Sequence, residues 1–160
     1  MSFFDYPDGD TAIDDGPGGR AFLADASDAD WDAIRSHSEL RIYQAGETVM
    51  AEGDADRALF VIVSGTLEAV VNEGRKTRGR RVSVMEAGTV IGEVGFFDGR
   101  PRSAEVRAAT DARLLRLGFE SFQHLAAKQP ALGRAILFDI GRVLAGRLRT
   151  VEALNAPGRA

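Results

Sequence analysis

The sequence lacks cysteine altogether and has only two histidines among its 160 residues. Without cysteine there are no disulfides and no thiolate metal sites, which fits a reducing cytoplasm. No apolar run approaches the roughly 18 residues of a membrane-spanning helix. The first residues, Met1 to Asp8, lack the basic start and apolar stretch of a signal peptide. We therefore expect a cytoplasmic protein that makes no contact with a membrane.

The scarcity of histidine also argues against catalysis. A β-barrel metalloenzyme needs clustered histidine and carboxylate ligands in its strands, but His37 and His124 are far apart and fall in or near expected helices. No arrangement of Ser, His and Asp suggests a nucleophile. We expect a protein that is not an enzyme and that uses neither a metal ion nor a cofactor.

The sequence also has no excess of positive charge, since its formal net charge is -4. Nucleic-acid-binding domains usually carry a basic balance, so we expect no contact with DNA or RNA. One basic stretch stands out and consists of Arg75, Lys76, Arg78, Arg80 and Arg81. It is either a solvated hairpin loop or a surface for an anionic partner.

What the sequence does contain is typical of one globular domain, with 44% hydrophobic and 28% charged residues. Residues 1–26 form an acidic, glycine-rich leader that we expect to be flexible, with Phe3, Phe4 or Phe22 as the side chains that could dock part of it. The domain itself spans 27–155, and 156–160 form a tail. Ser27 can cap a first helix that runs to about Ser36.

From Leu40 onward, short β-rich runs alternate with turn residues. They are Leu40–Tyr43, Thr48–Ala51, Ala58–Val63, Thr66–Val71, Val82–Met85, Thr89–Ile91, Ser103–Ala108 and Ala112–Arg116. Eight such strands predict a mainly β fold with flanking helices, arranged as a sandwich, a roll or a barrel. Gly46 and Gly65 are expected at turn positions with positive φ.

Helical periodicity returns after Gly118 and predicts helices over 119–127 and 131–154, with Pro130 suited to the first turn. Apolar residues of the last helix fall at heptad-like spacing: Leu137, Ile140, Leu144, Val151 and Leu154, with Arg147 interrupting. This helix packs either on its own β-roll or against a second copy in a homodimer, so the protein is a monomer or a homodimer.

The most informative segment is 91–106. A strand ends at Gly92, and Glu93 to Phe97 can form one short helical turn whose leading N–H groups attract an anion. Arg102 enters the next strand and can face the same cavity, where its planar fork of donors fits phosphate oxygens. Ser103 can add a hydroxyl donor, and Glu93 can accept from a sugar hydroxyl. The alternative is that Glu93 and Arg102 simply pair with each other across the turn.

This segment resembles the phosphate-binding cassette of the cyclic nucleotide-binding domain family, which includes the bacterial catabolite activator protein and the regulatory subunits of cyclic-nucleotide-dependent kinases. The matching residues are Ile91-Gly92-Glu93, Val94-Gly95-Phe96-Phe97 and Pro101-Arg102-Ser103-Ala104. Further matches follow in the right order at Ala45-Gly46-Glu47, Gly53-Asp54-Ala55-Asp56, Leu59 to Gly65 and Ala87-Gly88. The resemblance covers roughly 28–154. It implies an eight-stranded, jelly-roll-like β-roll with flanking helices.

The resemblance implies a role for each matching residue. Glu93 would accept from the ribose 2′-hydroxyl, and Arg102 would pair with the exocyclic oxygens of the cyclic phosphate. Further binding residues would be Gly92, Val94, Gly95, Ser103 and Ala104 around the phosphate, and Val82, Val84 and Ile91 in the wall beside sugar and base. The last helix would cover the base, with Thr150 as a candidate base contact.

These roles predict a sensor that binds a cyclic mononucleotide, cAMP in preference to cGMP because Ser103 fits the pattern of the catabolite activator protein. Binding would favour a closed position of the last helix and signal to an unidentified effector protein. Because the chain ends at Ala160, we expect no DNA-binding domain. The alternatives are a fragment of a nucleotide-responsive transcription regulator and an interaction module without a ligand.

Overall fold

The computed structural model describes residues 21–71, 80–155 and 157 of the chain. Residues 1–20 of the expected leader, nearly all of the expected tail, and Arg75, Lys76 and Arg78 of the basic stretch lie outside these residues.

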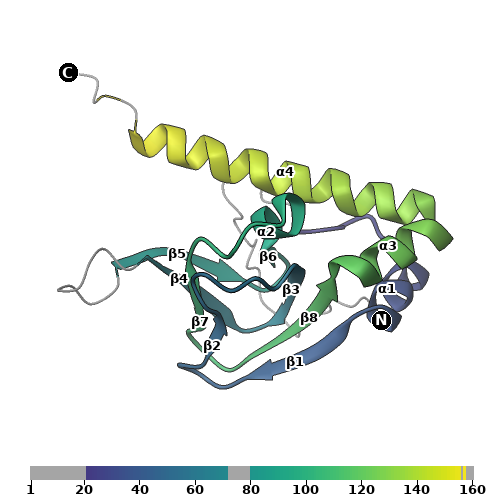
Figure 1. Cartoon of the computed structure of the whole chain (residues 1–160), viewed down its shortest axis with the longest axis horizontal. Helices are drawn as coiled ribbons and strands as arrows, with labels where there is room; N and C mark the ends of the chain where they lie inside the picture. The colour runs from purple at the N-terminus through teal and green to yellow at the C-terminus, as the bar shows by residue number, and fades with distance from the viewer. Residues whose placement is uncertain (1–20, 72–79, 156, 158–160) are drawn as a thin grey trace.

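Two antiparallel four-stranded sheets form the body of the domain (Figure 1). The strands are β1 (Glu39–Tyr43), β2 (Thr48–Met50), β3 (Ala58–Ser64), β4 (Thr66–Val71), β5 (Arg80–Glu86), β6 (Val90–Ile91), β7 (Glu105–Ala108) and β8 (Ala112–Gly118). One sheet has the order β1-β8-β3-β6 and the other the order β2-β7-β4-β5. The predicted eight-stranded β-roll is confirmed. The main differences are at strand ends, since Ser103 and Ala104 precede β7.

The strand β3 is buried on both faces, and its side chains point alternately into two separate hydrophobic clusters. Leu59 and Val61 face a cluster shared with the helices, whereas Phe60 and Ile62 face a cluster to which both sheets contribute. Strands that lie between two layers read as continuous apolar runs, because each side chain has an apolar neighbour. The run from Ala58 to Val63 therefore marks the centre of the fold.

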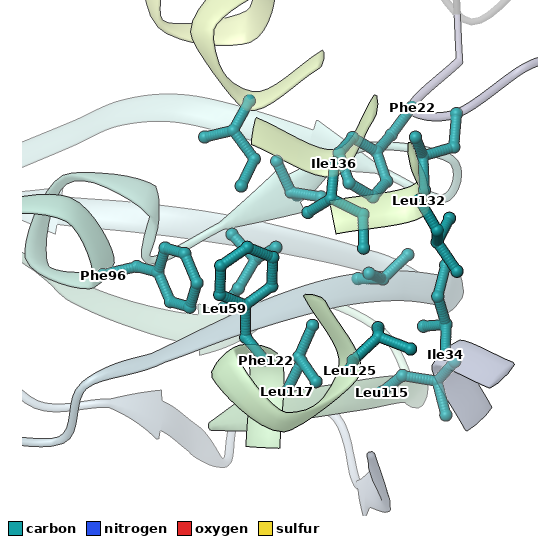
Figure 2. Close-up of a cluster of buried hydrophobic side chains, with 14 of the residues drawn as sticks. Phe22, Ile34, Leu59, Phe96, Leu115, Leu117, Phe122, Leu125, Leu132 and Ile136 are labelled. Carbon is teal, nitrogen blue, oxygen red and sulfur yellow. The ribbon is translucent and has the colours of Figure 1, made fainter. Parts of the chain in front are cut away.

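The residues that the structure describes also form four helices: α1 (Asp28–Ser36), α2 (Glu93–Asp98), α3 (Phe119–Lys128) and α4 (Pro130–Asn155). Ser27 caps α1 as expected, and its hydroxyl accepts from the Asp30 N–H at 3.1 Å while Asp30 accepts from the Ser27 N–H. Figure 2 shows the cluster beneath these helices, in which Phe122 and Leu125 of α3 pack against Leu59 and Leu117 of the sheet. Figure 1 shows α4 lying across the roll above α2.

The last residues of the predicted leader, 21–26, pack on the domain, and Phe22 docks there as one of the expected side chains. Phe22 and Leu23 fall within the leader predicted for 1–26, yet both are buried in the helix-side cluster, where Phe22 lies near Leu132 and Ile136 (Figure 2). The Phe22 N–H also donates to the Gly88 carbonyl at 2.8 Å. Residues 21–26 therefore pack on the domain, because two large apolar side chains gain more from burial than the segment loses in conformational freedom.

The apolar residues predicted at heptad-like spacing in α4 do not all face the core. Ile140 is fully buried in the core, whereas Leu137 is 39% exposed and its neighbour Phe138 is 76% exposed. The side chains of Val151 and Leu154 lie outside the described residues. A helix with 3.6 residues per turn places 137 and 140 on different sides of the line where α4 meets the roll. The first half of α4 is thus a core helix with an exposed apolar edge.

Candidate functional site

The short helix α2 begins at a sharp turn after β6. Gly92 stands at its N-cap in the left-handed region with φ 79°, and the Phe96 N–H donates to the Gly92 carbonyl at 3.0 Å. A Cβ at Gly92 would lie 2.8 Å from the Ala58 carbonyl oxygen and 2.8 Å from Nη1 of Arg102. Both the backbone angle and the close approach therefore require glycine. This residue brings the start of α2 directly over the Arg102 side chain.

Arg102 is buried, with only 5% of the residue exposed. Its Nη1 donates to the Gly92 carbonyl at 2.8 Å and its Nη2 to the Ala58 carbonyl at 2.7 Å, while its buried Nε–H has no hydrogen-bond partner. Within 21–71, 80–155 and 157, no carboxylate forms a salt bridge with it. Burial lowers the pKa of the Arg102 guanidinium from its usual value, although arginine stays charged at neutral pH.

The backbone of Arg102 is fixed from the opposite side. Its N–H donates to the Asp54 carbonyl at 2.8 Å, and its carbonyl accepts from the Gly53 N–H at 2.8 Å. The turn between β2 and β3 therefore holds the guanidinium under α2. Gly95 completes the fit, because a Cβ there would lie 3.2 Å from Nη1 of Arg102.

Glu93 is the other buried charged residue of this region, with 6% of the residue exposed. It does not pair with Arg102, so the simple Glu93–Arg102 pair considered from the sequence is not formed. Instead Oε1 of Glu93 accepts from Nη1 of Arg147, which comes from α4. Nη2 of Arg147 also donates to the Val90 carbonyl at 2.6 Å. A single side chain of α4 thus joins α2 and the start of β6.

The far end of α2 is held by a second arginine. Nε and Nη2 of Arg57 donate to the carbonyls of Phe96 and Phe97 at 2.9 and 3.0 Å, and its guanidinium lies 3.5 Å from the centre of the Phe119 ring. A cation at a helix C-terminus is favourable, and it satisfies carbonyls that have no partner within the helix. The Phe96 ring packs edge-on against Phe119 and Phe122 of α3, with centroids 5.5 and 5.3 Å apart.

The chemistry of this arrangement follows from its donors and charges. A buried cation without a carboxylate partner favours an anion, and the planar donor fork favours phosphate or carboxylate oxygens. The neighbouring Glu93 carboxylate accepts hydrogen bonds and suits a hydroxyl-bearing ligand. No group of three or more His, Asp or Glu residues is placed to hold a metal ion in the part of the chain that the structure describes.

A comparison with protein families gives a direct result. The model of the cyclic nucleotide-binding domain matches residues 40–129, which is more than half of the chain. The chain belongs to the cyclic nucleotide-binding domain family. This family membership confirms the resemblance inferred from segment 91–106.

Individual relatives agree with this assignment. The chain is 35% identical over 108 residues to a cAMP-dependent protein kinase regulatory subunit of Aspergillus niger, an alignment that covers 66% of this chain and 22% of that protein. It is 28% identical over 122 residues to the cAMP-activated global transcriptional regulator Vfr of Pseudomonas aeruginosa, covering 74% of this chain and 55% of the regulator. The chain thus spans about a fifth of one relative and about half of the other.

The fold is shared with solved structures. The crystal structure of a cyclic nucleotide-binding domain from Methylobacillus flagellatus superposes with a TM-score of 0.75 at 23% identity, covering 86% of this chain and 77% of that one. None of the helices that the structure describes here is both long and apolar enough to cross a membrane.

The structure brings several of the predicted binding residues together. Gly92 and Gly95 lie directly against the Arg102 guanidinium, and the buried Glu93 follows Gly92 at the start of α2. Val94 is half exposed on the outer side of α2, Ser103 is exposed, and Ala104 is half-buried. Their roles as phosphate contacts stay predictions.

The residues predicted to line the wall beside the sugar and base lie farther from Arg102 in the sequence, and their burial differs. Ile91 is buried in the cluster between the sheets, and Val84 is 38% exposed on β5. The side chain of Val82 lies outside the described residues. Thr150 is exposed, and its hydroxyl donates to the Gly146 carbonyl of its own helix at 3.1 Å. A base contact from Thr150 stays a prediction.

Two residues of the site were not predicted from the sequence. Arg147 was noted only as an interruption of the apolar stripe in 137–154, yet a cation on the inner side of a helix is itself a sign of a buried carboxylate partner. No sequence pattern marked Arg57 as part of the site, because its hydrogen-bond partners are backbone carbonyls of α2. Only the three-dimensional structure shows that these carbonyls lie within its reach.

Proposed function

We propose that this domain is a sensor that binds a cyclic mononucleotide, with the cyclic phosphate held by Arg102. The observation that carries the proposal is the buried guanidinium of Arg102, which has only neutral carbonyl partners and an unused Nε–H. A phosphate oxygen would satisfy that N–H and supply the opposite charge. The role is binding and regulation, with no catalytic step.

The sugar of the nucleotide would be recognised by Glu93. Arg147 engages Oε1 of this carboxylate, and a carboxylate has two oxygens that can accept further hydrogen bonds. A ribose hydroxyl and Arg147 can therefore bind the same carboxylate at once. A nucleotide held this way would touch α2 directly and α4 through one shared side chain.

We propose that cAMP is preferred over cGMP. The support comes from Ser103 in the family pattern and from the two relatives above, whose names refer to cAMP. The exposed hydroxyl of Ser103 lies next to Arg102, where it can donate to the phosphate. The preference is a prediction that calorimetry can decide.

The signal would pass through Arg147. Glu93 and Arg102 are 6% and 5% exposed, so a nucleotide reaches them only after neighbouring groups move aside. Arg147 is the contact that α4 makes with Glu93 and with β6. Because the bound ribose would hold the Glu93 carboxylate in place, nucleotide binding favours the state in which Arg147 and α4 are docked.

A protein partner receives this signal in our proposal. Leu137, Phe138 and Leu148 are exposed apolar side chains of α4, which are suited to an effector protein or to a second copy of the chain. A homodimer through α4 and a cytoplasmic location both stay predictions. Light scattering after size exclusion, with and without cAMP, tests the dimer.

Isothermal titration calorimetry with cAMP, cGMP and a cyclic dinucleotide tests the proposed function. We expect cAMP to bind most tightly. Arg102→Ala should weaken binding by about 2–5 kcal/mol, because the phosphate loses its buried partner. Glu93→Ala should cost about 1.5–3 kcal/mol, the usual value of a hydrogen bond to a charged group.

The matched control is Arg113→Ala, which removes an exposed arginine of β8 and changes the net charge equally. It should leave the affinity unchanged. If cAMP and cGMP do not bind, the proposed function is wrong, and if the cyclic dinucleotide does not bind either, an interaction module without a ligand is favoured. If both nucleotides bind but Arg102→Ala has no effect, the assigned site is wrong.

A further inference from the structure

The strand β1 lies at an edge of its sheet. The order β1-β8-β3-β6 places β8 on one side of it, and no strand among residues 21–71, 80–155 and 157 pairs with its other side. In an antiparallel sheet, alternate residues of such an edge strand direct their N–H and C=O groups outward. An open edge of this kind is a template for a further extended strand.

The apolar side chains of β1 leave this edge unprotected on one face. Leu40 is 49% exposed and Ile42 is 69% exposed. Both lie on the same face, because side chains along a strand alternate and residues two apart share a face. Proteins usually protect an open edge by keeping the strand very short or by charging it. The edge strands β2 and β6 have only three and two residues, whereas β1 has five.

The opposite face of β1 carries two opposite charges at a spacing of two residues. Nη2 of Arg41 lies 2.5 Å from Oε2 of Glu39, and the two side chains are exposed. When a second copy of β1 runs antiparallel beside the first, with Leu40 of one copy opposite Leu40 of the other, Glu39 of each copy faces Arg41 of the other. A two-fold axis at Leu40 therefore forms the same favourable cross-strand pair twice, as in other isologous interfaces.

The apolar face fits the same register. The two Leu40 side chains meet at the axis, and Ile42 of each copy lies diagonally from Leu40 of the other, a distance that long side chains can span. Registers centred on Glu39 or on Arg41 would instead place like charges directly opposite each other, which is destabilising. Charge and apolar burial thus favour the register centred on Leu40.

We infer that β1 is a docking surface for a second copy of this chain, with the two strands antiparallel about Leu40 and the two sheets joined edge to edge. Figure 1 shows β1 on the side of the roll away from α4 and α2, so this pairing does not depend on the nucleotide. Two strands of five residues bury little surface. The interface is therefore of the small, reversible kind, and the dimer dissociates on dilution.

Sedimentation equilibrium of the nucleotide-free protein tests the pairing. We expect a dimer that forms progressively between about 10 µM and about 1 mM protein. Glu39→Arg and Arg41→Glu should each weaken it at least about tenfold, because each substitution places like charges opposite each other on both sides of the axis. Thermal unfolding shows whether each variant is still folded, as expected for substitutions of exposed residues.

An equimolar mixture of these two variants separates pairing from folding. Glu39→Arg gives a chain with arginine at both positions, and Arg41→Glu gives a chain with glutamate at both. Antiparallel pairing then forms opposite-charge contacts only between unlike chains. We expect a heterodimer with an affinity within about threefold of the wild-type dimer, although the contact between Glu39 and Arg41 within each chain stays broken.

The matched control lies on β7. Arg107 also pairs with a carboxylate two residues away, since its Nε lies 2.6 Å from Oε1 of Glu105. Because β7 is between β2 and β4, it has no open edge. Arg107→Glu therefore makes the same change of charge as Arg41→Glu and should leave the dimer unchanged.

Several results would overturn the inference. One is a protein that stays monomeric over the whole concentration range, and another is a dimer that both single variants retain. Absence of a heterodimer in the mixture would also contradict it. A dimer that Phe138→Ser abolishes and Glu39→Arg retains would assign the contact to α4 instead. Calorimetry with cAMP is a separate measurement, so its failure would refute the proposed function and leave the β1 dimer standing.

Discussion

The contact between Glu93 and Arg147 leads to a quantitative prediction. Loss of one partner from a fully buried ion pair costs about 3–5 kcal/mol, whereas an exposed pair contributes about 0–1 kcal/mol. The Glu93 side chain is 8% exposed and that of Arg147 is 34% exposed, so this pair is intermediate. Arg147→Gln should therefore lower the free energy of unfolding by about 2 kcal/mol. It should also weaken cAMP binding about tenfold, because Glu93 is then held less firmly.

A double-mutant cycle with Glu93→Gln provides the assay. Urea unfolding of the wild type, both single variants and the double variant should give a coupling free energy of about 1–2 kcal/mol. Arg149→Gln is the matched control, since it removes an exposed arginine of the same helix and should change stability by less than about 0.5 kcal/mol. Strictly additive effects of the Glu93 and Arg147 substitutions would refute the coupling of α2 to α4.

Three further predictions concern groups that support the site and the fold. Arg57→Gln should weaken cAMP binding by about 1 kcal/mol in calorimetry, because the last carbonyls of α2 lose a charged donor; an unchanged affinity would contradict this. Gly65→Ala should lower the free energy of unfolding by roughly 2 kcal/mol or more, since φ is 88° and the Cβ would lie 2.3 Å from the Asp111 carbonyl oxygen. Gly46→Ala, with φ 90° but open space, should cost clearly less. The hydrogen bond from Arg116 holds the pKa of Asp56 below its ordinary 3.8. Asp56 therefore contributes stability above about pH 4, by at most about 1 kcal/mol because the pair is partly exposed, and the contribution is lost as pH falls through the lowered pKa; the difference between wild type and Asp56→Asn in thermal unfolding should vanish in acid.

The fold could be predicted because its signals are local. Most strands are short runs rich in apolar or β-branched residues and are followed by turn residues. Gly46 and Gly65 have the positive φ that their places in these turns suggested. The packing of Phe22 and Leu23 against the domain could not be predicted in the same way. Their partners, Gly88 and Asp139, are distant in the sequence, and the acidic residues before them are typical of a mobile leader.

The site could be predicted in part for the same reason. Gly92, Glu93 and Arg102 fall within one short segment with a recognisable spacing, so the sequence indicates that they meet. Arg147 lies 54 residues from Glu93. A heptad-like pattern cannot tell which side of a helix faces the roll, and so the contact of Arg147 with α2 required the packing of α4 to be known.

The most direct test of the account follows the unused Nε–H of Arg102 by ¹⁵N NMR. This buried N–H has no partner in the free protein, so a phosphate oxygen that reaches it should move its proton resonance downfield and slow its exchange with water. Saturating cAMP should produce this change, and adenosine, which lacks the phosphate, should not. If cAMP binds while the Arg102 Nε–H resonance stays where it is in the free protein, the guanidinium does not hold the phosphate and the account is wrong.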